Sequence, residues 1–219
     1  MLRRTNAAPR RLAVLAAVCA TLAGCGQSDG DKFRAAVEKV RKGETHAIEV
    51  KAFPKITDKD LEALQNAGDL ESLSLDDAPI TDEGLKHLAG LSKLSWLSLT
   101  GTRVTDAGLP PLTELNSLEF LRLDRTRVKD PGMQTIAAIP RLKELSLWKC
   151  VVTDQGVASL AKLNNLERLS LAETLVTDAG LKPLQALTNL KYLSVWNTKV
   201  SDAGVNEIKQ AIKGVEVVR

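Results

Sequence analysis

The sequence holds few of the residues from which catalytic and metal sites are usually built. Its 219 residues include two histidines and three cysteines. It contains no spacing typical of a nucleophile with its base, no Cys or His pair at metal-ligand spacing, and no phosphate-binding glycine loop. These absences predict a protein without catalytic activity, bound metal or cofactor.

A hydrophobic run long enough to cross a membrane is also missing at the N-terminus. The uncharged stretch there covers residues 12–23, and twelve helical residues span roughly 18 Å, well short of the ~30 Å hydrocarbon core. Arg3, Arg4, Arg10 and Arg11 precede this stretch. Basic residues before a short apolar run that ends in small residues predict a secretory signal, not a transmembrane anchor.

The end of this stretch, Leu22-Ala23-Gly24-Cys25, resembles the lipobox of bacterial lipoproteins. The resemblance implies that residues 1–24 are a lipoprotein signal peptide, that Cys25 carries a diacylglycerol, and that residues 25–30 form a flexible tether. An ordinary signal peptide with a chance cysteine is the alternative. Gly26, where some lipoproteins carry Asp, favours the outer membrane or the periplasmic face of the envelope by analogy with lipoprotein sorting.

Removal of the signal changes the charge and the cysteine count. Residues 1–24 carry four arginines and no acidic residue, so the net charge of +3 falls to −1. A basic pI therefore gives no reason to expect a nucleic-acid partner. Cys19 leaves with the signal and Cys25 would be acylated, so Cys150 has no partner for an intramolecular disulfide.

An internal repeat with a constant period of 24 dominates the rest of the chain. A Thr-Asp or Ser-Asp pair recurs at multiples of this period, and six full units (residues 70–213) begin with leucine. Counted from that leucine, positions 1, 4, 6, 11, 16, 19 and 22 hold Leu, Ile, Val or Met at 41 of 42 sites; Ala211 is the exception. Such regularity predicts a solenoid of stacked units.

The period of the apolar residues changes within each unit. Alternation around positions 4 and 6 predicts a short strand, whereas Leu85, Leu88 and Leu91 lie three residues apart and predict a short helix. The Thr-Asp pair before that helix is interpreted as its cap. Stacked strands lie about 4.8 Å apart and helices about 8–10 Å apart, so the strands must line a concave face and the helices a convex one.

The stretch Leu-x-x-Leu-x-Leu-x-x-Thr-x-Val-Thr-Asp-x-Gly-Leu-x-x-Leu, beginning at Leu94, resembles the leucine-rich-repeat family, in its short variety with Thr or Cys at position 9. The resemblance implies an α/β, right-handed, horseshoe-shaped solenoid over residues 46–219. We expect a cap helix in residues 31–45, with Phe33, Val37 and Val40 on its buried face. Residues 46–69 would form an irregular first repeat, and residues 214–219 a last strand.

Three further expectations concern particular positions. Position 9, which includes Cys150, should point inward and satisfy backbone groups. Pro111 and Pro183 should make the helices of their units start late or become 3₁₀-like. The recurrent Asp could form a calcium ladder, because calcium binds several oxygens, but helix capping explains it more simply.

Positions 3, 5 and 7 of each unit should be exposed on the concave face, because alternate strand residues share a face. Five of the seven aromatics outside the signal fall there: Trp96, Phe120, Trp148, Tyr192 and Trp196. We expect Trp96 and Phe120 to touch as a cross-strand pair. Trp148 and Trp196 should flank a slot, and Arg122 and Arg168 could supply polar contacts to a ligand.

The leading hypothesis is therefore an envelope lipoprotein, held to the bilayer through acylated Cys25, that binds a protein or peptide on its concave face. Binding of a glycan or of the cell wall through the same aromatics is the alternative. A second alternative is a structural envelope protein without a specific ligand, in which the aromatics only pack on one another.

Overall fold

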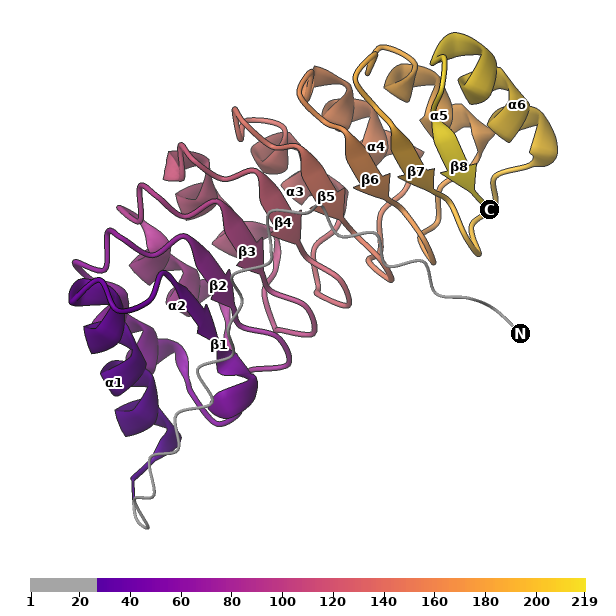
Figure 1. The fold of residues 1–219 in the computed structure, drawn as a ribbon. Helices are drawn as coiled ribbons and strands as arrows, with labels where there is room; N and C mark the ends of the chain where they lie inside the picture. The colour runs from indigo at the N-terminus through magenta and orange to yellow at the C-terminus, as the bar shows by residue number, and fades with distance from the viewer. Residues whose placement is uncertain (1–26) are drawn as a thin grey trace, which may run out of the picture.

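A computed structural model describes residues 27–219 and shows an open arc of stacked units (Figure 1). The expected signal peptide, Cys25 and the first residues of the tether lie outside the described residues. Eight parallel strands form one sheet in sequence order. Its strands are β1 (Ala47–Glu49), β2 (Ser72–Ser74), β3 (Trp96–Ser98), β4 (Phe120–Arg122), β5 (Glu144–Ser146), β6 (Arg168–Ser170), β7 (Tyr192–Ser194) and β8 (Glu216–Val218).

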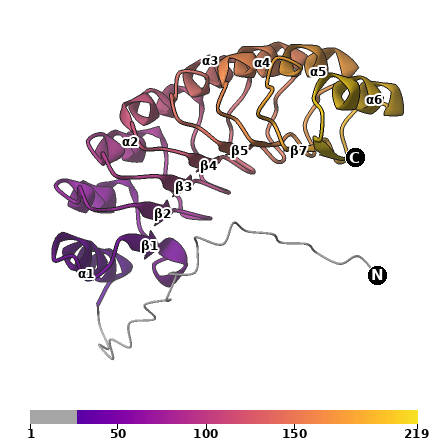
Figure 2. The same cartoon turned by 45° about the horizontal axis from the view of Figure 1, so that its top comes forward.

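The helices cover the outer side of this sheet, so that the strands line the concave face (Figure 2). The α-helices after α1 are α2 (Asp82–Leu85), α3 (Asp130–Ile136), α4 (Asp154–Ser159), α5 (Asp178–Leu184) and α6 (Asp202–Ala211). The 3₁₀ helices are Val50–Ala52, Asp58–Leu64, Lys86–Leu88, Asp106–Gly108, Pro110–Glu114 and Leu160–Lys162. The predicted α/β solenoid, with parallel strands inside and short helices outside, is confirmed.

The repeat leucines form one continuous core along the arc. At position 4 the strands place Leu73, Leu97, Leu121, Leu145 and others side by side, and each of these four is fully buried. At Ala211, where the apolar pattern fails, α6 extends to ten residues and the next residue, Ile212, is buried instead. No helix among the described residues is long and apolar enough to span a bilayer.

The N-terminal cap helix α1 (Asp29–Arg41) begins earlier than predicted. Ser28 and Asp31 form a capping box, in which each side chain accepts the other residue's backbone N–H. Asp29 and Gly30, which the sequence predicts to lie in the flexible tether, are therefore helical. The predicted face of Phe33, Val37 and Val40 is buried.

The first repeat is more regular than its sequence suggests. β1 joins the sheet in continuous parallel register, with Ala47 opposite Ser72 and Ile48 opposite Leu73. The separation of these partners exceeds the repeat period by a single residue, and the 3₁₀ turn Val50–Ala52 follows the strand directly. Phe53 then packs edge-on against Phe33 of the cap, with ring centroids 6.2 Å apart.

The prolines act as predicted in one unit and not in the other. The unit of Pro111 has only 3₁₀ segments on its convex side, Asp106–Gly108 and Pro110–Glu114. Pro183, in contrast, lies inside α5, which starts directly at Asp178. The prediction for Pro183 was wrong because the last turn of a short helix tolerates the loss of one backbone N–H bond when packing holds the helix in place.

The recurrent Thr-Asp pair has two separate roles. Thr81, Thr105, Thr153 and Thr177 cap their own helices by accepting a backbone N–H, as predicted. The Asp, however, does not cap its own helix. It accepts the backbone N–H and the hydroxyl of the Thr or Ser in the next unit; Asp82, for example, bonds Thr105 N–H at 2.7 Å and its hydroxyl at 2.6 Å.

We call this series of contacts the Asp ladder; its members are Asp58, Asp82, Asp106, Asp130, Asp154 and Asp178. The same contacts explain the glycine two residues after each Asp from Asp82 onward. A Cβ added at Gly84 would lie 2.5 Å from the Asp58 carboxylate, and one at Gly156 would lie 2.3 Å from that of Asp130. The carboxylate of one unit thus occupies the space that a side chain would need in the next.

One rung of the ladder is incomplete, and its repair should stabilise the protein. Lys129 stands where the other units have Thr or Ser, so α3 has no side-chain cap and Asp106 receives only backbone N–H bonds. We expect Lys129→Thr to raise the free energy of unfolding by about 1 kcal/mol, the usual value of such a cap. Urea unfolding of Lys129→Thr beside Lys129→Ala measures this, since Ala removes the lysine without adding a hydroxyl. Equal stability of the two variants would contradict the prediction.

Candidate functional site

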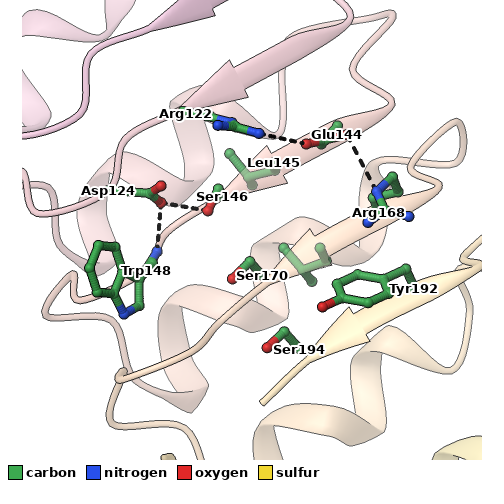
Figure 3. A pocket seen from close by; sticks show the side chains of 11 residues that line it. Arg122, Asp124, Glu144, Leu145, Ser146, Trp148, Arg168, Ser170, Tyr192 and Ser194 are labelled. Carbon is green, nitrogen blue, oxygen red and sulfur yellow. Dashed lines mark hydrogen bonds and ion pairs between the residues drawn. The ribbon is translucent and has the colours of Figure 1, made fainter. Parts of the chain in front are cut away.

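The concave face carries a basin over β4 to β7, with a cavity volume of about 290 Å³ (Figure 3). Its rim is formed by Arg122, Glu144, Arg168 and Tyr192, and Asp124 and Trp148 close the opposite side. The floor consists of Leu145, Ser146, Leu169, Ser170 and Ser194. We call this site the concave basin.

Sheet register explains why these residues meet. Arg122, Ser146, Ser170 and Ser194 all occupy position 5, and the register aligns them across four consecutive strands. Glu144, Arg168 and Tyr192 form the parallel row at position 3. Because both rows point away from the buried leucines of position 4, they project onto the same exposed surface.

Charges of both signs alternate along the rim. Glu144 lies between two arginines, 3.7 Å from Arg122 and 3.4 Å from Arg168. The Arg168 guanidinium also lies over the ring of Tyr192, 4.3 Å from its centroid. These contacts hold the long side chains in place, which lowers the entropy that a ligand would otherwise lose when it orders them.

Asp124 is a half-buried acid of the basin. Its Oδ1 accepts the Ser146 hydroxyl and the Trp148 backbone N–H, the latter at 2.9 Å. Burial raises the pKa of the Asp124 carboxyl above its ordinary value, although these two hydrogen bonds and Arg122 oppose the shift.

This raised pKa predicts a pH effect on stability. A carboxyl whose pKa is higher in the folded state binds its proton more tightly there, so its contribution to stability falls as pH rises from the ordinary pKa through the raised one. Asp124→Asn keeps an oxygen acceptor and removes the titration. We therefore expect the variant to gain stability relative to the wild type over that pH window, in urea unfolding across the acid range. A difference independent of pH would contradict the assignment.

Four of the predicted ligand-binding residues meet in the basin: Arg122, Trp148, Arg168 and Tyr192. Trp96, Phe120 and Trp196 lie outside it. Register places Trp96 opposite Phe120 as predicted, but the aromatic contact found within residues 27–219 is Phe33 with Phe53. Trp196 is 50% exposed on the same face.

The structure places a basin between Trp148 and Tyr192, whereas the slot between Trp148 and Trp196 stays a prediction. The indole N–H of Trp148 donates to Glu173 at 3.0 Å, and Lys149 lies 5.8 Å from the indole ring. These contacts fix the orientation of the Trp148 indole, which cannot be predicted from its position in the repeat.

Sequence reasoning missed the part played by Asp124 and by the floor serines. The signal was present, because Asp76 bonds Ser98 and the Thr100 N–H in the same way as Asp124 bonds Ser146 and the Trp148 N–H. An Asp at position 7 followed by a Ser at position 5 of the next unit, the last residue of its strand, therefore marks a cross-unit contact.

Position 9 points inward, as predicted. The hydroxyls of Thr102, Thr126, Thr174 and Thr198 each donate to the backbone carbonyl three residues earlier. Cys150 is 2% exposed, its thiol donates to the Leu123 carbonyl, and burial raises its pKa. A buried thiol with a raised pKa suits the structural role expected of it and not a reactive one. Within residues 27–219, no group of three or more His, Cys, Asp or Glu could hold a metal ion.

Comparison with known proteins agrees with this architecture. Residues 69–89 match the family described as Leucine Rich repeat. The crystal structure of internalin C2 from Listeria monocytogenes is similar, with a TM-score of 0.63 and 21% sequence identity over 85% of this chain and 91% of that one. No curated protein matches the chain. The structural similarity shows the leucine-rich-repeat fold, a solenoid with an extended concave surface.

Proposed function

We propose that this protein is an exported, lipid-anchored leucine-rich-repeat protein of the bacterial envelope that binds a protein or peptide in its concave basin. The observation that carries the proposal is the basin itself. On one exposed surface it combines a Trp, a Tyr, two carboxylates and two arginines that are held in place by Glu144. Aromatic and arginine side chains are the groups that most often dominate protein interfaces.

Glycan binding is a second candidate function, because the positive and negative charges of the basin are equal in number. Arg122 and Arg168 are matched by Asp124 and Glu144, and the hydroxyls of the floor serines can both donate and accept hydrogen bonds. A neutral sugar ring stacked against Trp148 could form hydrogen bonds with these lining residues through its hydroxyl groups. We expect no catalytic activity from either candidate, in keeping with the sequence.

Affinity capture from the native envelope separates these functions. The bait is the protein from residue 26 onward, as wild type and as a Trp148→Ala, Tyr192→Ala double variant. Trp96→Ala serves as the matched control, because Trp96 lies on the same wall outside the basin. Circular dichroism verifies that all three baits are folded.

We expect a protein to be retained by the wild type and by Trp96→Ala, and to be lost from the double variant. Retention of the wild type on cell-wall polysaccharide, lost in the same double variant, would favour the glycan. Equal capture by all three folded baits would reject the basin as a binding site and favour a structural role.

Lipid attachment is tested separately from binding. We expect the protein expressed in a bacterium to incorporate a radiolabelled fatty acid and to fractionate with membranes, and Cys25→Ser to lose both properties. A wild-type protein that is exported without taking up the label would contradict acylation and favour an ordinary signal peptide.

A further inference from the structure

A second surface follows the edge of the arc at which the strands end. We call it the strand-end rim and define it by position 10 of each unit, counted from the start of the repeat, with Lys55 as the equivalent residue of the first repeat. Its members are Lys55, Pro79, Arg103, Arg127, Val151, Leu175 and Lys199. All except half-buried Pro79 are exposed.

The rim row carries four cations and no acid. The ion pairs that the structure gives within residues 27–219 involve none of these four cations. On the opposite edge of the arc three lysines are neutralised by acids, whereas Arg141 and Lys213 take part in none of the ion pairs given for residues 27–219. There Lys93 pairs with Asp69, Lys143 with Glu119 and Lys191 with Glu167, at 2.6 to 2.8 Å.

Acids do lie near the rim, and each has a partner inside the protein. Asp77 pairs with Arg125 at 2.7 Å, and Glu173 lies 3.7 Å from Lys149. The carboxylates of the Asp ladder are half-buried and accept hydrogen bonds from the next unit. Asp202 pairs with Arg219.

The rim also exposes two neighbouring aliphatic side chains. Val151 is 54% exposed and Leu175 is 47% exposed, and they occupy the same position in consecutive units. Aliphatic side chains flanked by cations characterise proteins that lie on anionic membranes, where the apolar groups enter the interface and the cations meet the headgroups.

The chain enters the solenoid at this same rim. The carboxylate of Asp29, in the first turn of α1, accepts the backbone N–H of Lys55 at 3.0 Å. In Figure 1 the start of α1 and the loops that follow the strands lie along the same lower side of the arc. Cys25 precedes the helix cap Ser28 by three residues, which span at most about 11 Å.

We propose that the strand-end rim rests on the surface of an anionic phospholipid bilayer. This inference builds on the proposed acylation of Cys25, which would hold the start of α1 within that short reach of the headgroups. One edge of a curved solenoid can lie along a flat surface. The concave basin then opens sideways, parallel to the membrane, and stays free for a partner.

Fluorescent labels on the two edges test the orientation. The acylated protein is reconstituted in phosphatidylethanolamine–phosphatidylglycerol vesicles after labelling Leu175→Cys on the strand-end rim or Asn116→Cys on the opposite edge. Cys150 is buried and does not compete for the label in the folded protein. Phospholipids with a nitroxide near the headgroup then quench the labels that approach the bilayer.

We expect the label at residue 175 to be quenched several-fold more strongly than the label at residue 116. Arg103→Glu with Arg127→Glu should reduce that difference, and so should vesicles of phosphatidylcholine alone. Equal, weak quenching at both sites in a protein that floats with the vesicles would overturn the inference.

The experiment distinguishes a wrong proposal of Cys25 acylation from a wrong proposal that the strand-end rim contacts the membrane. A wild-type protein that does not float with vesicles would count against acylation of Cys25. The rim is then tested with the chain from residue 26 tethered through an N-terminal hexahistidine to nickel-chelating lipid. The same comparison of the two labels decides there as well.

Discussion

Gly156→Ala should destabilise the protein by about 3 kcal/mol, the combined effect of overpacking and of lost charged hydrogen bonds. The direction of this change is unusual. A glycine inside a helix such as α4 normally lowers the stability of the protein by roughly 0.5–1 kcal/mol relative to alanine, so its replacement by alanine normally stabilises. Here the new Cβ would lie 2.3 Å from the Asp130 carboxylate and 3.0 Å from the Asp130 Cα. The carboxylate would have to leave the Thr153 N–H and hydroxyl, which it accepts at 2.8 and 2.6 Å.

Urea unfolding measures this change, and two comparisons test its cause. Gly68→Ala is the matched control, because no heavy atom lies within 4 Å of a Cβ there, so we expect no loss of stability. In an Asp130→Ala background the Gly156→Ala change should cost much less, since residues in contact are energetically coupled. Additive effects of the two substitutions would show that the ladder carboxylate is not what excludes a side chain at Gly156.

Leu145→Ala should destabilise the protein by about 3 kcal/mol, within the range found for buried leucines. Leu145 is fully buried at the centre of β5, and it lies between Leu121 and Leu169 of the neighbouring strands. A cavity there would weaken the packing of the unit against both of its neighbours, and each unit of a solenoid depends on those contacts.

The matched control for Leu145→Ala is Val217→Ala. Val217 occupies the equivalent place in β8, pairs with Leu193 on one side only and is partly buried. We expect it to cost about 1 kcal/mol or less in urea unfolding, because its surroundings can relax. Similar losses for both variants would mean that the end of the arc is packed as tightly as its centre.

The sequence predicted the fold well because the information was periodic. Apolar residues at fixed positions, repeated in every unit, determine which faces are buried, and this held from Leu70 to Ile208. The early start of α1 was missed because it depends on the reciprocal bonds of Ser28 and Asp31. The α-helical conformation around Pro183 was missed because packing against the neighbouring units outweighs a local preference.

The candidate site was predicted only in part. Position in the repeat placed Arg122, Trp148, Arg168 and Tyr192 on the concave face, and the structure brings them to one basin. Periodicity does not say where a side chain turns once it is exposed. The Trp148 indole is oriented by its hydrogen bond to Glu173, and the Arg168 guanidinium is oriented by its contact with the Tyr192 ring. Both contacts join one unit to the next. The role of the ladder Asp was misjudged for the same reason, since its partner lies in the following unit.

The Asp ladder runs in one direction, and this gives the chain a modular growth rule. Each unit presents a carboxylate forward and a glycine gap backward, together with a Thr or Ser hydroxyl in every unit except that of Lys129, so the internal junctions from Asp58 to Ser201 follow one pattern. The Asp202 carboxylate, which is next in the series, is bonded by Arg219. Duplication of any one repeat would therefore insert a unit whose two joints already match, and the length of the concave face could change while its curvature and its end pieces were kept.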